Sequence, residues 1–277
     1  MPPVNRSRLF PAAGLLLAAT ILVAAVRYDR QRHSDDYLKN ARTLMLATRG
    51  SERVWAHRVN SLGDLREAKS IFAGVEADLV FDSASNRFQV RHPPKPDTGL
   101  SLDAYLASAV DRPQLRLWLD WKNPTPGNIP AALAELNRLD AKYRIRGRAL
   151  VETPSDAIFA QVASVSRSGF LHGLYLPTER TLEALRAGPQ ATSRLGAELR
   201  RTLEQGGFGA ITYDARVQAF VDAELDRFLE QRKLRRFSWD MRIDSADADT
   251  DPKRLSRIVE ERRLTGLLVS FPSRYRV

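Results

Sequence analysis

The feature that most constrains the fold of this chain is a regular alternation between short apolar runs and longer amphipathic segments. The runs are rich in β-branched and aromatic residues, as buried strands usually are. There are eight of them: Arg53–Val59, Gly74–Asp82, Leu115–Asn123, Arg148–Pro154, Leu171–Thr178, Gly209–Arg216, Lys233–Met241 and Leu264–Pro272. The segments of helical period between them are Leu62–Phe72, Leu102–Val110, Ile129–Tyr143, Ala157–Val165, Leu182–Leu203, Val217–Leu229 and Pro252–Arg263.

Eight strands alternating with seven helices predict an α/β chain that closes into a parallel (β/α)₈ barrel of the TIM type. A doubly wound open sheet is the alternative. It usually stops at roughly five to seven strands and needs a glycine-rich phosphate loop after an early strand, which this sequence lacks. The length of 277 residues fits one barrel with a short tail, although two smaller domains would also fit.

An uncharged stretch near the N-terminus, Leu9–Val26, ends at Arg27. Its length is at the short limit of a membrane-spanning helix. A cleaved signal peptide would need small residues at the cut, and only Val23-Ala24-Ala25 offers them. An uncleaved transmembrane signal anchor fits the length better. Either interpretation exports the rest of the chain, so we expect a membrane-anchored protein whose main domain is periplasmic or extracytoplasmic.

The predicted organisation is therefore an N-terminal signal anchor with its flanks (residues 1–32), a spacer (33–50) and a barrel domain (51–277). The net charge of +10 is partly local, because residues 1–33 hold five arginines against one aspartate. The remaining basic residues form no long run interleaved with aromatics, which argues against a nucleic-acid partner. A basic surface facing anionic lipid explains the charge equally well. The chain has no cysteine, which excludes a lipoprotein anchor, disulfides and thiolate metal sites.

Polar residues gather where a barrel of this kind carries its active site, at the carboxyl ends of the strands. Glu76 and Asp78 lie two apart in the second predicted strand, so both carboxylates share one face. Asp120 and Lys122 have the same spacing in the third. Three carboxylates against one ammonium in a partly dry cavity would cost several kcal/mol per unpaired ion. A divalent cation would offset that cost, and a set of oxygen ligands favours Mg²⁺ or Ca²⁺ over zinc.

Two histidines accompany this set: His57 ends the first predicted strand, and His92 follows a short extension after the second. Beside a cation, one histidine can take a proton from an attacking hydroxyl or water, and the other can protonate the leaving alkoxide. Lys122 and the cation would stabilise charge on phosphoryl oxygens. Each part alone has a plain structural explanation, such as solvent-facing carboxylates or a surface ion pair. Their order at the ends of three successive strands is what favours a functional site.

This order resembles the phospholipase C-like phosphodiesterase superfamily, which includes glycerophosphodiester phosphodiesterases and sphingomyelinase D-like TIM barrels. The menorin family is the closest in pattern. The similar stretches are Trp55-Ala56-His57 with Asn60-Ser61, Glu76-Ala77-Asp78, His92-Pro93-Pro94 and Asp120-Trp121-Lys122, within residues 53–123. The resemblance implies His57 and His92 as the acid/base pair, Lys122 on the phosphate, and Glu76, Asp78 and Asp120 as metal ligands.

The sequence departs from the glycerophosphodiesterase pattern at three points. Val59 follows Arg58 where those enzymes usually have glycine, Pro93 follows the second histidine where they usually have aspartate, and Asp120 stands where they usually have glutamate. These departures bear on recognition of a glycerol group more than on metal binding.

Further candidates lie at the ends of other strands. We expect Arg58, Glu152 and Trp239 to contribute to substrate binding, although Glu152 has an equally good structural explanation and a tryptophan is more often part of a core. Tyr175, Tyr213 and Asp214 are weaker pocket candidates. We assign no role to His33 or His172.

Two functions from different classes follow. The first is a metal-dependent phosphodiester hydrolase acting on a glycerophosphodiester or a phospholipid headgroup. The second is a non-catalytic, membrane-tethered recognition or adhesion module of the menorin kind that keeps the barrel. The presence of both His57 and His92 favours the enzyme, because a binding module needs no acid/base pair beside a cation.

Overall fold

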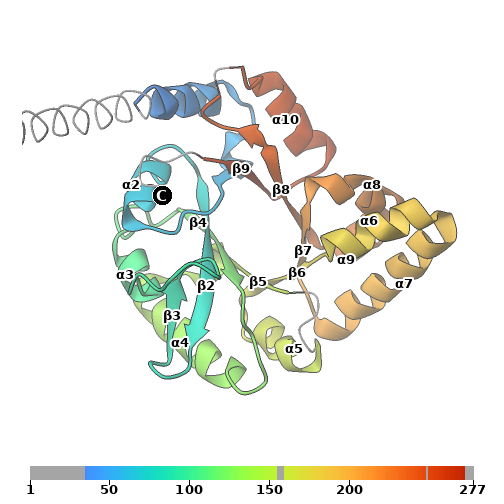
Figure 1. The fold of residues 1–277 in the computed structure, drawn as a ribbon, viewed down its shortest axis with the longest axis horizontal. Helices are drawn as coiled ribbons and strands as arrows, with labels where there is room; N and C mark the ends of the chain where they lie inside the picture. The colour runs from blue at the N-terminus through green and yellow to red at the C-terminus, as the bar shows by residue number, and fades with distance from the viewer. Residues whose placement is uncertain (1–34, 155–158, 248, 272–277) are drawn as a thin grey trace, which may run out of the picture.

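The computed structural model describes residues 35–154, 159–247 and 249–271. These residues form a barrel of eight parallel strands with helices around it (Figure 1). The sheet closes because β1 pairs with both β2 and β9, as the predicted TIM-type barrel requires. The parallel strands are β1 (Val54–Ala56), β2 (Gly74–Asp82), β4 (Arg116–Trp121), β5 (Ala149–Thr153), β6 (Leu171–Tyr175), β7 (Ala210–Asp214), β8 (Arg235–Asp244) and β9 (Gly266–Ser270). The extension after β2 forms β3 (Arg87–Val90), an antiparallel partner of β2.

The barrel interior is filled by aromatic and aliphatic side chains. Trp55, Trp118 and Phe237 form its centre, and the Phe237 ring centroid lies 5.6 Å from that of Trp55 and 5.5 Å from that of Trp118. Gly74 makes room for this packing, because a Cβ there would lie 2.5 Å from the Trp55 ring. The larger core lies between the outer faces of the strands and the helices. The interior is therefore a packed core, and a ligand can enter only at its ends.

The helices largely follow the predicted segments: α2 (Leu62–Ala68), α3 (Leu102–Ala107), α4 (Ile129–Tyr143), α5 (Phe159–Arg167), α6 (Thr178–Ala187), α7 (Pro189–Gly206), α8 (Gln218–Phe220), α9 (Asp226–Arg232) and α10 (Pro252–Glu261). The single helix predicted over Leu182–Leu203 is two helices. The chain breaks at Gly188, which has φ 99°, and α7 restarts with Pro189 at its first turn. Neither residue continues a helix readily, which explains the break.

Residues 35–47 form a helix ahead of the barrel, which we call helix 35–47. Its Ala41, Leu44 and Met45 are buried, so this part of the predicted spacer packs on the barrel. Arg42 bonds to Ser70 after α2, and Arg49, just beyond the helix, pairs with Glu260 of α10. Helix 35–47 thus covers the barrel wall between α10 and α2 (Figure 1).

The predicted anchor, Leu9–Val26, lies outside the described residues. Within the described part of the chain, no helix combines the length and the apolar character needed to cross a bilayer. The anchor therefore stays a prediction from sequence.

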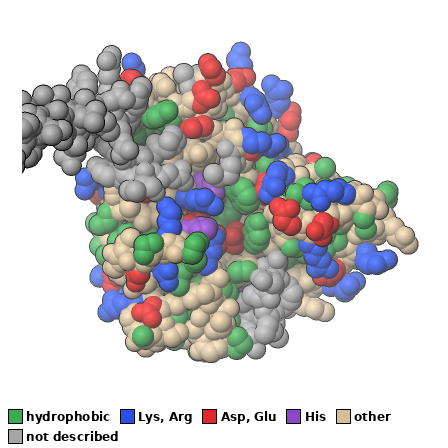
Figure 2. Space-filling model, in the orientation of Figure 1, with side chains coloured by type: hydrophobic (Ala, Val, Ile, Leu, Met, Phe, Trp, Pro, Cys, Tyr) green, Lys and Arg blue, Asp and Glu red, His purple; other side chains and the backbone are tan. Residues whose placement is uncertain are grey.

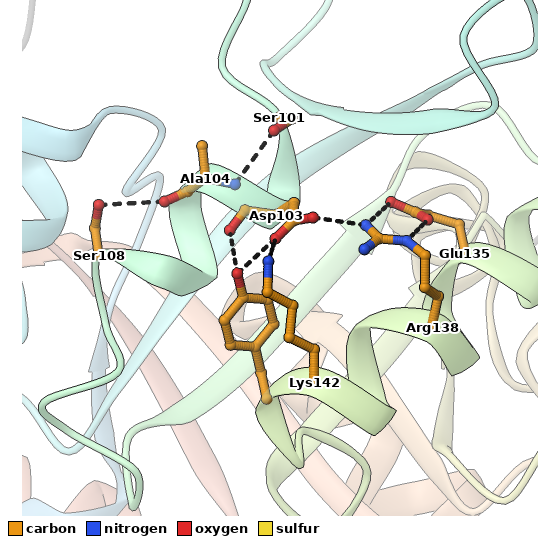
Figure 3. A network of polar contacts seen from close by, with 8 residues as sticks. Ser101, Asp103, Ala104, Ser108, Glu135, Arg138 and Lys142 are labelled. Carbon is orange, nitrogen blue, oxygen red and sulfur yellow. Dashed lines mark hydrogen bonds and ion pairs between the residues drawn. The ribbon is translucent and has the colours of Figure 1, made fainter.

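A polar clamp joins α3 to α4 on the outside of the barrel (Figure 3). Asp103 of α3 accepts hydrogen bonds from Tyr143 Oη at 2.5 Å, Arg138 Nη2 at 2.8 Å and Lys142 Nζ at 2.9 Å. Arg138 also makes two bonds to Glu135, at 2.6 and 2.8 Å. The hydrogen bonds from Tyr143 and Lys142, with Arg138, hold the pKa of the Asp103 carboxyl well below its usual range.

Replacing Asp103 with Asn should lower the free energy of unfolding by about 1 kcal/mol at pH 7, because a solvated ion network contributes on that order. A depressed carboxyl pKa stabilises the fold above the unfolded-state value of about 3.9, and that contribution is lost as the pH falls through the lower folded-state pKa. The difference between Asp103→Asn and the parent should therefore shrink at pH 3. Urea unfolding at both pH values measures it, and an equal difference at both would contradict the assignment.

A second prediction concerns the N-terminal boundary of the folded domain. A chain beginning at residue 33 should fold and remain in solution. A chain beginning at residue 51 loses the buried side chains of helix 35–47, and its free energy of unfolding should be lower by about 3 kcal/mol or more, the value for two large apolar side chains. Urea unfolding compares the two. Equal midpoints would show that the helix adds nothing, and failure of the longer chain to fold would place residues 1–32 in the core.

Candidate functional site

A cavity of about 290 Å³ opens at the carboxyl ends of the strands. In Figure 2, histidine, acidic and basic side chains meet in the hollow near the centre of this face. The cavity gathers most of the residues predicted from sequence, and it adds Trp118, Pro154 and Leu268 to its walls. Its predicted members are His57, Arg58, Glu76, Asp78, Asp120, Lys122, Glu152, Tyr175 and Trp239.

The centre of the site is a cluster of three carboxylates. Glu76, Asp78 and Asp120 each offer one oxygen, and the three oxygens lie within 4.8 Å of one another. The strand register explains the convergence, because Asp78 on β2 lies directly beside Asp120 on β4. Glu76 and Asp78 are almost fully buried. The predicted ligand set is thus assembled at one point at the barrel mouth.

Lys122 is the cation closest to this cluster. Its ammonium lies 2.9 Å from Asp78 Oδ1 and also contacts Asp120 Oδ2. Burial would lower the pKa of Lys122, but the charges of Asp120 and Asp78 outweigh it and raise that pKa above its ordinary value. Lys122 therefore stays protonated and directs its charge into the cavity.

Two groups from the loop after β1 hold the carboxylates in place. The Arg58 amide donates to Glu76 Oε2 at 2.5 Å, from a left-handed backbone with φ 57°. Asn60 bonds twice to Asp78: its Nδ2 donates to Oδ2 at 2.6 Å, and its Oδ1 accepts from the Asp78 amide at 2.9 Å. Asn60 has no predicted role of its own, although its place three residues after His57 in the family-like stretch could have indicated one.

Burial and mutual repulsion shape the charges of this cluster. Burial, and then the neighbouring Asp78 and Asp120, raise the pKa of Glu76 well above its ordinary value. Burial and Asp78 also raise the pKa of Asp120. Burial would raise the pKa of Asp78 as well, but the charge and hydrogen bond of Lys122, with a hydrogen bond from Asn60, lower it. One ammonium therefore compensates only part of the cluster.

Glu152 of β5 lies beside Asp120 in the sheet register and lines the same cavity. The Trp118 indole donates to Glu152 Oε2 at 3.0 Å. Burial, and then the charge of Asp120, raise the pKa of Glu152 well above its ordinary value. Glu152 thus belongs to the acidic wall of the site, next to the three-carboxylate cluster.

His57 occupies the edge of the cluster. Its Nε2 lies 3.8 Å from Glu76 Oε2, and its ring stacks on Trp239 with centroids 6.0 Å apart and planes at 26°. Its backbone amide donates to Val269 of β9, which fixes the strand end. Trp239 thus lines the cavity, and it also orients the His57 imidazole by stacking on it.

His92 lies in a neighbouring cavity of about 510 Å³, which shares Arg58 with the first. Asn60, Arg91 and Lys95 line the same space. His92 is near enough to Asp78 for its charge to lower the pKa of that carboxyl. The two histidines thus flank the carboxylate cluster from different cavities.

Two of the weaker candidates do not line the site. Tyr213 is fully buried and donates to Gln218, and Asp214 pairs with Arg216 after β7. Strand alternation turns Tyr213 toward the helices, whereas Asp214, the next residue, faces the other side and is held by its ion pair with Arg216. His172, which had no assigned role, bridges Thr153 and Ser166 in the core, and burial lowers its pKa to about 3. His33 lies outside the described residues.

The cluster fits a hard divalent cation. Glu76 Oε1 is buried and has no hydrogen-bond partner in the described part of the chain. A buried carboxylate oxygen in that state is costly, and cation ligation would satisfy it. The donors are all carboxylate oxygens, the ligand type that Mg²⁺ and Ca²⁺ prefer.

No protein-family model matches this sequence, and no curated protein matches it. Solved structures share its fold. A glycerophosphodiester phosphodiesterase from Parabacteroides distasonis gives a TM-score of 0.53 at 14% identity, covering 79% of this chain and 94% of the other. A Silicibacter pomeroyi protein provisionally named a glycerophosphoryl diester phosphodiesterase gives 0.56 at 15% identity, covering 86% and 95%.

A third structure, a glycerophosphodiester phosphodiesterase from Agrobacterium tumefaciens, gives a TM-score of 0.50 at 13% identity and covers 80% of this chain and 98% of the other. These likenesses confirm the TIM-type barrel that the resemblance to the phospholipase C-like phosphodiesterase superfamily implied. The closer likeness to menorins stays a prediction.

The uncompensated charge of the cluster leads to a stability prediction. Glu76→Gln removes one buried negative charge and keeps the shape, so the metal-free protein should gain roughly 1 kcal/mol or more in free energy of unfolding at pH 7. Urea unfolding in a chelating buffer measures this. Glu183→Gln on exposed α6 is the matched control and should change it by less than about 0.5 kcal/mol. A destabilised Glu76→Gln protein would show that Glu76 is already compensated.

Proposed function

We propose that this protein is a metal-dependent phosphodiester hydrolase acting on a glycerophosphodiester or a phospholipid headgroup. The observation that carries the proposal is the convergence of Glu76, Asp78 and Asp120 at the barrel mouth, with Lys122 in contact and His57 beside them. The names of the solved structures that share the fold agree with this activity. Those structures are distant in sequence, so the site residues carry most of the argument.

Glu76, Asp78 and Asp120 would hold the cation, and Lys122 would face the phosphoryl group beside it. When bound, Mg²⁺ or Ca²⁺ supplies Lewis-acid stabilisation of charge on the phosphoryl oxygens. Lys122 adds a second positive charge, and its raised pKa keeps it protonated throughout the neutral range.

His57 and His92 would transfer the protons. His57 is held between the Glu76 carboxylate and the Trp239 ring, so its imidazole has a fixed direction toward the cavity. His92 approaches the cluster from the neighbouring cavity. Two histidines on different sides of the phosphoryl group suit an in-line displacement, in which one removes a proton from the attacking oxygen and the other protonates the leaving alkoxide.

The two adjoining cavities support a substrate with a sizeable group on each side of the phosphate. The first holds the carboxylate cluster, and the second, lined by Asn60, His92 and Lys95, is large enough for a small organic group. Arg58 lines both and is placed to contact the phosphate between them. Glu152 and Trp239 would contact the group in the first cavity.

We also propose that residues 1–32 tether the barrel domain to a membrane, with that domain on the periplasmic or extracytoplasmic side. The uncharged stretch Leu9–Val26 supports this part of the proposal. A tether of this kind would keep the site near phospholipids and their diester products.

The activity is tested with bis(p-nitrophenyl) phosphate as a generic diester. Hydrolysis should require Mg²⁺ or Ca²⁺ and stop on chelation. His57→Asn or His92→Asn should lower kcat by about 10²-fold or more while the cation still binds, since positioned acid/base groups contribute on that order. Asp120→Asn should weaken both cation affinity and kcat, because it removes a ligand charge.

His172→Asn is the histidine control, since His172 lies in the core outside this cavity; any loss should follow stability and not kcat in the folded fraction. An active His57→Asn/His92→Asn double variant would rule out the two-histidine mechanism. Cation binding with no hydrolysis of any diester by the parent protein would favour the recognition or adhesion module instead.

A further inference from the structure

The opposite end of the barrel carries a basic hollow. This cavity of about 800 Å³ opens at the amino ends of the strands, away from the carboxylate cluster. Its walls carry five arginines and one carboxylate: Arg53, Arg116, Arg146, Arg148, Arg235 and Glu52. A positive potential therefore fills one end of the barrel, while the other end is acidic.

Two of these arginines are held side by side. Arg116 begins β4 and Arg148 directly precedes β5, and the two strands are paired in register just beyond them. Arg116 Nη1 donates to the Gly147 carbonyl at 3.3 Å, and Arg148 Nη1 donates to the Leu115 carbonyl at 2.6 Å. Each guanidinium thus reaches across to the other's chain segment, and backbone carbonyls fix two like charges beside each other.

The nearby carboxylates are already used by other arginines. Glu52 lies 3.5 Å from Arg53, and Asp140 lies 3.2 Å from Arg146. Among the described residues, Arg116, Arg148 and Arg235 have no ion pair with a carboxylate within 4.0 Å. Three guanidinium groups around one hollow therefore lack a carboxylate partner in the part of the chain that the structure describes.

Arg148 bears the largest cost of this arrangement. It is half-buried, and its Nε is shielded from solvent without a hydrogen-bond partner in the described chain. Burial and the charge of Arg116 lower its pKa from the ordinary value. Arginines on an ordinary solvated surface spread apart into water, whereas this pair stays together with a donor unsatisfied. An anion bound in the hollow would offset the repulsion between the two guanidinium groups.

We infer that this basic hollow binds a phosphorylated ligand with at least two negative charges, at a site separate from the carboxylate cluster. Guanidinium forks match phosphate oxygens in a bidentate geometry, and Arg116, Arg148 and Arg235 supply three of them. Trp55, Phe170 and Phe237 add apolar wall, and the volume exceeds what one phosphate needs. The ligand is therefore an organic or condensed phosphate, either free in solution or part of a lipid headgroup.

Calorimetric titration of the full-length protein with pyrophosphate, in metal-free buffer at low salt, tests the site. The double variant Arg116→Gln/Arg235→Gln should bind pyrophosphate at least tenfold more weakly than the parent. The control Arg254→Gln/Arg257→Gln removes two exposed arginines from α10 and should bind like the parent. Asp120→Asn, at the other end of the barrel, should also bind like the parent, which separates this site from the mouth.

Vesicle binding distinguishes the two ligand sources. Phosphatidylcholine vesicles with and without phosphatidic acid are compared for the parent and the double variant. A phosphatidic-acid-dependent increase in binding that Arg116→Gln/Arg235→Gln abolishes identifies a lipid headgroup. Pyrophosphate binding without such an increase identifies a soluble ligand.

The inference is wrong if neither probe binds, or if the double variant binds as tightly as the parent. Both arginines are exposed at the ends of strands, so unfolding of the variant is not expected, and urea unfolding checks this. Arg235→Gln alone gives a second test if the double variant is unstable. Diester hydrolysis should be the same in the parent and in Arg116→Gln/Arg235→Gln. Absence of phosphate binding in the hollow would therefore not contradict the proposed hydrolase activity, and absence of hydrolysis would not contradict phosphate binding in the hollow.

Discussion

The site depends on one constraint, the parallel register between β2 and β4. That register places Asp78 directly beside Asp120, and the two-residue spacing on each strand brings Glu76 and Lys122 to the same interior face. A shift of either strand by one residue would turn its two site side chains toward the helices and separate them from the other two. Trp118 and its neighbours fill the barrel interior beneath these charged groups. The charged groups therefore lie between an apolar core and the solvent at the barrel mouth.

The sequence predicted the barrel because its strands are apolar on both faces and its helices are amphipathic, so the two periodicities alternate visibly. It also predicted which side chains meet at the barrel mouth, because their positions follow from strand alternation once the barrel is assumed. These are Glu76, Asp78, Asp120, Lys122 and His57. Other features depend on the three-dimensional path of loops. The two hydrogen bonds between Asn60 and Asp78 and the place of His92 in a second cavity could not be derived from spacing.

The one error in the predicted helices has a different origin. Helical period continues through Gly188, so the hydrophobic pattern alone could not show the break between α6 and α7, although Gly188-Pro189 is a recognisable stop and start. The sequence predicts a spacer over residues 33–50, because residues 28–50 are largely polar. In helix 35–47, the side chains of Ala41, Leu44 and Met45 bury one face against the barrel. Whether a segment packs depends on a surface that the rest of the chain provides.

Lys122 links the acidic mouth to the proposed chemistry. Its ammonium contacts Asp78 and Asp120, two of the three carboxylates that would hold a cation. In the metal-free protein, this lysine is the nearest compensating charge, and the raised pKa of Glu76 shows that its compensation is incomplete. A cation on the same carboxylates would compete with Lys122 for their oxygens and weaken its ion pairs. The ammonium could then turn toward a phosphoryl oxygen in the cavity. The charge that compensates the carboxylates is thus also the charge available to a substrate.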